Sequence, residues 1–170
     1  MKIQKSMNFS QKHTYLIVEG PQAGEFLQGQ ITIDVEKILD KDFKPACICN
    51  NKGRVIATFW IKKLKNGFKI AILEELSISF EEHMKKYIPF FDAQLKKGEQ
   101  DSFKNELDST EWMKFLINKG IVEVNKHTSS KFTPHELNYQ NNELIDFSKG
   151  CFNGQEVIAR MEYRGKLKFA

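Results

Sequence analysis

A cysteine near the C-terminal end of the sequence has the surroundings of a reactive thiol. Cys151 lies in the octet Lys-Gly-Cys-Phe-Asn-Gly-Gln-Glu, residues 149–156, whose two glycines let the backbone turn tightly and approach a ligand closely. A helical pattern follows at once, and the positive end of a helix dipole favours the thiolate form of a nearby cysteine. Local chemistry alone still favours a buried structural cysteine, because free cysteines are among the most buried residue types.

Polar side chains next to this cysteine have both functional and ordinary interpretations. Gln155 and Glu156, in the first turn of the predicted helix, would direct an amide and a carboxylate toward an occupant of the loop, whereas simple helix capping is the alternative. Glu156, Arg160 and Arg164 recur at intervals of four residues, which predicts an exposed ion-pair ladder. The alternative is a weak basic strip that continues to Lys166 and contacts the phosphates of a nucleic acid. We favour the ion-pair ladder.

The other two cysteines do not complete a recognisable metal site. Cys47 and Cys49 would lie on one face of a strand, and Cys151 could supply a third ligand, but a metal or cluster site usually needs a fourth ligand and a more typical spacing. We therefore predict no metal. An odd number of cysteines also argues against a disulfide framework and is typical of a reducing compartment. With no membrane-spanning apolar run and no signal-peptide core, we expect a cytoplasmic protein that does not associate with membranes.

Length and charge set broad limits on the organisation of the chain. Its 170 residues predict a single domain over residues 1–170, with a possible subdivision near the polar stretch 96–110. The net charge of +4 is too weak to indicate nucleic-acid binding by itself, since that function needs a concentrated basic face.

The elements that must position the octet mix strands and helices without regular alternation, which predicts an α+β fold with an antiparallel sheet and packed helices. The central prediction is three antiparallel strands joined by tight turns at Asn50–Gly53 and Asn66-Gly67. The predicted strands cover residues 15–18, 43–49, 54–64, 68–73, 90–95 and 121–124. The predicted helices cover residues 21–28, 74–87, 109–119 (capped by Ser109 or Thr110 and ended by Gly120) and 154–163.

Four ordered segments resemble motifs of the YgfZ family, folate-binding relatives of the glycine-cleavage aminomethyltransferase (T-protein). Residues 149–156 resemble its K-G-C-(Y/F)-x-G-Q-E signature, and residues 26–35 resemble its F-L-Q-G-Q-(V/I)-T-x-D-(V/L) segment. Residues 50–54 lie where the family has a D-x-K-G-(K/R) hairpin, and residues 132–138 resemble F-x-P-(Q/H)-x-x-N. The resemblance implies a folate-binding domain of the T-protein type.

The resemblance also implies a cofactor, partners and site residues. The implied cofactor is folate, as tetrahydrofolate or a one-carbon derivative. The implied role is the maintenance of iron–sulfur enzymes, with such enzymes or their assembly factors as partners and tRNA modification reached indirectly. Within this resemblance Cys151 becomes the functional thiol, which reverses the expectation from local chemistry. The implied folate-binding residues are Trp112, Glu136, Asn138, Gln155, Glu156 and Asn50, with His13 at the place of a second family tryptophan.

Departures from the family pattern keep other functions open. The strand after the hairpin reads Arg-Val-Ile-Ala-Thr-Phe, residues 54–59, and lacks the acidic residue of the aminomethyltransferases. A folate-dependent one-carbon transferase is therefore the second hypothesis, and a non-catalytic RNA- or protein-binding module is the third. The segment before Trp112 is short, and the sequence ends at Ala170, where the family continues into a β-barrel. We expect a shortened member without the barrel, whose pocket is open or completed by a second copy.

Overall fold

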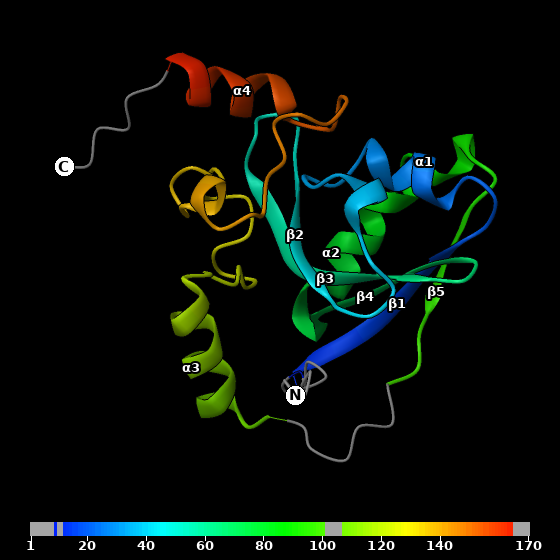
Figure 1. Ribbon diagram of the computed structural model, residues 1–170, viewed down its shortest axis with the longest axis horizontal. Helices are drawn as coiled ribbons and strands as arrows, with labels where there is room; N and C mark the ends of the chain where they lie inside the picture. Colours follow the sequence, from blue (N-terminus) through cyan, green and yellow to red (C-terminus); the bar gives the residue numbers. More distant parts are fainter. Residues whose placement is uncertain (1–8, 10–11, 101–106, 165–170) are drawn as a thin grey trace.

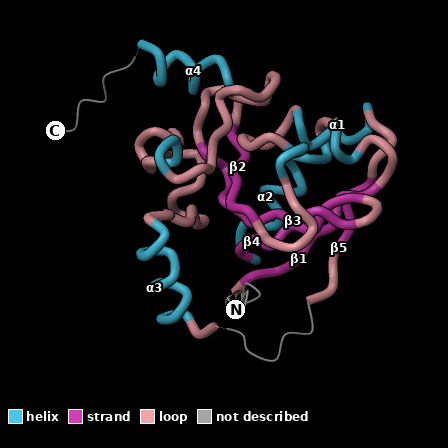
Figure 2. The backbone as a smooth tube through the Cα atoms, viewed as in Figure 1, coloured by secondary structure: helices cyan, strands magenta, loops and turns pink. Residues whose placement is uncertain are grey.

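A five-stranded sheet forms the centre of the protein in a computed structural model that describes residues 9, 12–100 and 107–164 (Figures 1 and 2). The strand order is β2-β3-β4-β1-β5, and every neighbouring pair is antiparallel. The strands are β1 (His13–Glu19), β2 (Lys44–Cys49), β3 (Val55–Leu64), β4 (Gly67–Leu73) and β5 (Gln94–Lys97). The helices are α1 (Ala23–Gln28), α2 (Glu74–Lys85), α3 (Ser109–Lys119) and α4 (Gln155–Arg164), with 3-10 turns η1 (Val35–Lys37), η2 (Ile88–Phe90) and η3 (Tyr139–Asn141).

The predicted α+β class, with an antiparallel sheet and packed helices, is confirmed. The three-stranded meander β2-β3-β4 also forms where the turn residues predicted it. At its second turn, Gly67 has φ +154 and a side chain there would overlap the Val18 carbonyl of neighbouring β1, so this position requires glycine.

Three local predictions are wrong. The strand expected at residues 90–95 forms later, as β5, because the 3-10 turn η2 occupies its expected start. Residues 121–124 form no strand: Ile121 and Val124 are buried, but the Val124 N–H donates to the side-chain hydroxyl of Thr58 in β3 instead of to a strand carbonyl. Helix α3 is capped by Asp108, whose carboxylate accepts from the backbone of Thr110 and Glu111 in a capping box.

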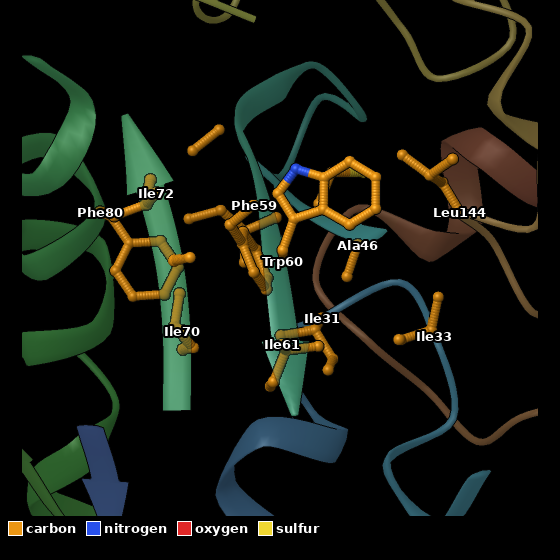
Figure 3. Packing of buried hydrophobic residues seen from close by; sticks show 14 of the residues in the cluster. Ile31, Ile33, Ala46, Phe59, Trp60, Ile61, Ile70, Ile72, Phe80 and Leu144 are labelled. Atoms are coloured by element: carbon orange, nitrogen blue, oxygen red, sulfur yellow. The ribbon is translucent and has the colours of Figure 1, made fainter. Parts of the chain in front are cut away.

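The sheet is covered on both faces. Helix α2 buries Leu76, Phe80 and Met84, spaced four residues apart, against one face, where the Phe80 ring lies 5.2 Å from the Phe59 ring. Figure 3 shows Phe80 on one side of β3 and β4, with Trp60, Ile33 and Leu144 on the other. These residues belong to one continuous core cluster that draws side chains from both ends of the chain.

The segment that follows α3 returns across the sheet to the start of β3. Its backbone joins that strand through the Val55 N–H, which donates to the Phe132 carbonyl, and through the Ser130 N–H, which donates to the Val55 carbonyl. Farther along, the buried Thr32 hydroxyl donates to the Leu144 carbonyl at 2.6 Å. This return path brings the last part of the chain to the turn between the end of β2 and the start of β3 (Figure 1).

Candidate functional site

The octet loop is fixed to the C-terminal end of α1. The Lys149 Nζ donates to the carbonyls of Gln28 and Ile31, both at 2.6 Å, and lies 4.7 Å from the centre of the Phe152 ring. The Asn153 N–H donates to the Gly29 carbonyl at 3.1 Å. Two of the four family-like segments, residues 26–35 and 149–156, are therefore joined directly on both sides of Cys151.

The hairpin at residues 50–53 forms the next contact of the octet. Gly154 has φ +82, and a Cβ atom there would lie 2.5 Å from the Asn50 carbonyl oxygen and 3.1 Å from the Gly53 Cα. A Cβ on Gly53 would in turn meet Val157 at 3.0 Å. The Asn50 side chain forms its hydrogen bonds within the turn, because its Oδ1 accepts from the backbone N–H groups of Lys52 and Arg54. The hairpin and the octet thus approach backbone to backbone.

The fourth family-like segment, residues 132–138, reaches the same place through Arg54. The Arg54 guanidinium donates to the Lys131 carbonyl at 2.6 Å and to Glu136 Oε2 at 3.4 Å. Glu136 Oε2 also accepts from the backbone and the hydroxyl of Thr133. The Thr133 N–H above all holds the pKa of Glu136 below its ordinary value, and the Thr133 hydroxyl and Arg54 act in the same direction. Glu136 is therefore an exposed, ionised carboxylate.

Cys151 lies at the exposed apex of the octet loop, so its thiol is open to a partner molecule. Glu156 is exposed and pairs with Arg160 at 2.9 Å, while Gln155 is half-buried. Asn138 adopts a left-handed conformation and accepts from Asn141 at 2.6 Å. Asn138 also accepts from the side chains of Gln140 and Asn142, which are local contacts, and a pocket shared by Asn138 and the octet stays a prediction.

Trp112 and His13 form a second group of their own. The His13 Nε2 is 2.8 Å from one oxygen of Glu123, and the Trp112 Nε1 donates to the other oxygen at 2.8 Å. The two rings meet edge to face at 4.8 Å. Figure 1 shows α3, which carries Trp112, at the opposite end of the molecule from α4. The structure therefore does not place Trp112 and His13 beside the octet loop.

A groove of about 680 Å³ lies beside this second group. Its lining is mainly apolar and includes Met113, Ile117 and Val122, together with the Trp112 edge and Glu123. Trp112 itself is only 4% exposed, and its ring stacks with Phe115 at 5.2 Å. A pterin could stack on Trp112 only after a neighbouring ring moved aside.

The chemistry of folate provides a fit test for these residues. A pterin ring presents N–H donors along one edge, and an ionised carboxylate is a suitable acceptor for them. Glu136 meets this need, since its Oε2 carries all three of its hydrogen bonds within the described part of the chain and its Oε1 carries none. The motif junction therefore fits the pterin edge, whereas the aromatic group around Trp112 does not offer a free stacking face.

The first pair of the ion-pair ladder expected on α4 is confirmed by the contact between Arg160 and Glu156. Both side chains are well exposed, so the pair contributes little to stability. Arg164 lies exposed at the end of α4, and Lys166 lies outside the described residues. The continuous basic strip stays a prediction.

Cys47 and Cys49 are both buried in β2. A hydrogen bond to Cys47, together with burial, raises the pKa of Cys49 well above its ordinary value, so this thiol is inert. In the described ranges, no group of three or more His, Cys, Asp or Glu side chains is arranged to hold a metal ion. None of the described helices is long and apolar enough to cross a membrane.

Sequence reasoning missed several residues that hold the site together. Lys149 stands inside the octet, but the sequence alone assigns it no role. Glu123 fell in a segment that was interpreted as a strand. Tyr139, whose buried hydroxyl contacts Thr58 and donates to the Val122 carbonyl, carries no sequence signal.

The contacts between the family-like segments near an exposed thiol agree with the resemblance to the YgfZ family, and comparison with known proteins confirms that this chain is similar to YgfZ proteins. The chain is 25% identical to the tRNA-modifying protein YgfZ of Buchnera aphidicola subsp. Schizaphis graminum, over 89% of this chain and 67% of that protein. It is 26% identical to the tRNA-modifying protein YgfZ of Blochmanniella pennsylvanica, over 91% of this chain and 67% of that protein. An uncharacterized protein of Haemophilus influenzae is 29% identical to this chain, over 90% of this chain and 67% of that protein.

The matched stretch is longer in the relatives than in this chain. The alignment with the Buchnera protein spans 214 positions, more than the 170 residues here, so the relative has residues within it that this chain lacks. No protein-family model matches the sequence. Among solved structures, the glycine cleavage system aminomethyltransferase T from Bartonella henselae superposes on 51% of this chain and 24% of its own, with a TM-score of 0.48 and 17% identity.

Proposed function

We propose that this chain is a folate-binding accessory protein of the YgfZ type that supports iron–sulfur enzymes and, through them, tRNA modification. The observation that carries the proposal is the meeting of the four family-like segments around the loop of Cys151. Lys149, Gly154 and Arg54 make the contacts that join them. The similarity to proteins named as tRNA-modifying supports the link to tRNA.

Within this proposal the residues of the junction have separate roles in binding folate and in contacting a client protein. Glu136 accepts the N–H donors of the pterin edge through its ionised carboxylate, with Asn138, Asn50, Gln155 and Glu156 around it. Bound tetrahydrofolate supplies a carrier of one-carbon units. Cys151, exposed at the loop apex, is the thiol that contacts a client protein. We place this work in the cytoplasm, where free thiols persist.

Aminomethyl transfer receives no support from the site. Strand β3 contains no acidic residue, and its Ala57 and Thr58 are fully buried. The Thr58 hydroxyl is already engaged with Tyr139 and with the Val124 N–H. A neutral hydroxyl in this network does not replace the general acid or base of a transferase.

Calorimetric titration of the whole chain with tetrahydrofolate tests the folate part of the proposal. We expect saturable binding that weakens about tenfold or more in Glu136→Gln, because a charge-assisted hydrogen bond contributes roughly 1.5–3 kcal/mol. Glu82→Gln, which changes an exposed carboxylate on α2, is the matched control and should leave binding unchanged. Absence of saturable binding at millimolar ligand, or equal loss in both variants, would contradict the assignment.

A further inference from the structure

The loop that carries Cys151 is attached at two points on either side of the thiol. On one side, the Lys149 Nζ bonds to the carbonyls of Gln28 and Ile31, and on the other, the Asn153 N–H bonds to the Gly29 carbonyl. The Asn153 side chain also donates to the Tyr87 hydroxyl at 3.0 Å. The thiol lies between the two attachments and is exposed, while Lys149 and Phe152 beside it are buried.

Lys149 donates to the last carbonyl of α1, that of Gln28, and to the carbonyl of Ile31, which lies beyond the helix. The last carbonyls of a helix have no partner within the helix, and a basic residue in the last turn often satisfies them. Helix α1 has no basic residue in its last turn. Lys149, 121 residues farther along the chain than Gln28, supplies that donor.

We propose that Lys149 is the positioning residue of this site: its amino group, bonded to the carbonyls of Gln28 and Ile31, holds Cys151 at the exposed apex of the loop formed by residues 149–153. The inference deepens the proposed function, on which it rests only in taking Cys151 as the working thiol. The role is specific to the Lys149 side chain, because no other side chain in the described residues donates to these two carbonyls.

Burial of the amino group gives the role a pH signature. Burial lowers the pKa of Lys149 to about 8, against the opposing influence of Asp34, Asp146 and Cys151. If the loop were released, the Lys149 amino group would return to its ordinary pKa of 10.5. The attached state therefore binds fewer protons than the released state between about pH 8 and 10.5, and its stability rises with pH in this range. The hydrogen bond from Lys37 lowers the pKa of Asp146 to about 2, so the charge of Asp146 does not change in this range.

A nitroxide label on Cys151 tests the proposal in the folate-free protein, so its outcome is independent of folate binding. Cys47 and Cys49 are buried, which leaves Cys151 as the thiol that reacts. In Lys149→Met we expect a larger mobile component in the label spectrum and roughly tenfold faster exchange of the Asn153 amide. Lys52→Met, which changes an exposed lysine of the hairpin, should behave as the unchanged protein.

The pH response of the unchanged protein provides a second test. In the labelled protein the mobile component should shrink between about pH 8 and 10, and this response should be absent in Lys149→Met. Equal label mobility in Lys149→Met and the unchanged protein would overturn the proposal. A label spectrum without the pH response in the unchanged protein would overturn it as well.

Discussion

Gly154 provides the sharpest test of how the motifs are joined. A Cβ atom there would lie 2.5 Å from the Asn50 carbonyl oxygen, closer than real Cβ atoms approach other atoms, and the residue has φ +82. For alanine the left-handed conformation alone costs about 1–2 kcal/mol. Overlap with a backbone oxygen adds roughly 1–3 kcal/mol, because the hairpin of residues 50–53 must move.

We therefore expect Gly154→Ala to lower the free energy of unfolding by about 2–5 kcal/mol, which corresponds to a fall in Tm of roughly 5–15 °C for a chain of this size. Gly150→Ala is the matched control from the same octet, because a Cβ there meets no atom within 4 Å. Its effect should stay within about 0.5 kcal/mol. Urea unfolding followed by circular dichroism measures both variants, and equal stability of the two would refute the backbone contact between octet and hairpin.

Three further predictions concern buried and paired groups. Burial lowers the pKa of His83 to about 4, so the neutral ring contributes stability above pH 6.5 that is lost as pH falls through 4, and His83→Gln should flatten that part of the stability profile. The hydrogen bond from Lys37 lowers the pKa of Asp146 to about 2, so the ionised carboxylate contributes stability that is present above pH 3.8 and is lost as pH falls through 2. Profiles of the free energy of unfolding against pH for Asp146→Asn should lack this loss. Trp112→Phe removes a donor to Glu123 and should cost about 1–3 kcal/mol in urea unfolding, and a cost near zero would show that this hydrogen bond does not matter.

The sheet could be predicted because its signals are local. The turns at residues 50–53 and 66–67 have residue types that bend the chain, and the strands between them are rich in β-branched and aromatic residues. The helix end at Gly120 was equally clear, since the residue adopts φ +64 as expected of a helix-ending glycine. Apolar side chains at residues 121–124 misled because burial without strand pairing gives the same pattern.

The site could be predicted only in part, because its contacts join distant segments. The octet indicated a functional loop, but nothing local shows that Lys149 bonds to the end of α1 or that Glu123 holds both His13 and Trp112. The family resemblance named Trp112 and Glu136 together, whereas the fold places them in separate groups. Such long-range pairings depend on the packing of the whole chain and have no periodic signal in the sequence.

The most direct test of the central claim is the level of thiolated tRNA in a bacterial strain that lacks its own YgfZ protein. The proposed function predicts that this chain restores thiolation and that Cys151→Ser, produced to the same soluble level, does not. Full restoration by Cys151→Ser, or no restoration by the unchanged chain, would contradict the claim that the exposed thiol of the octet loop supports the enzymes of tRNA modification.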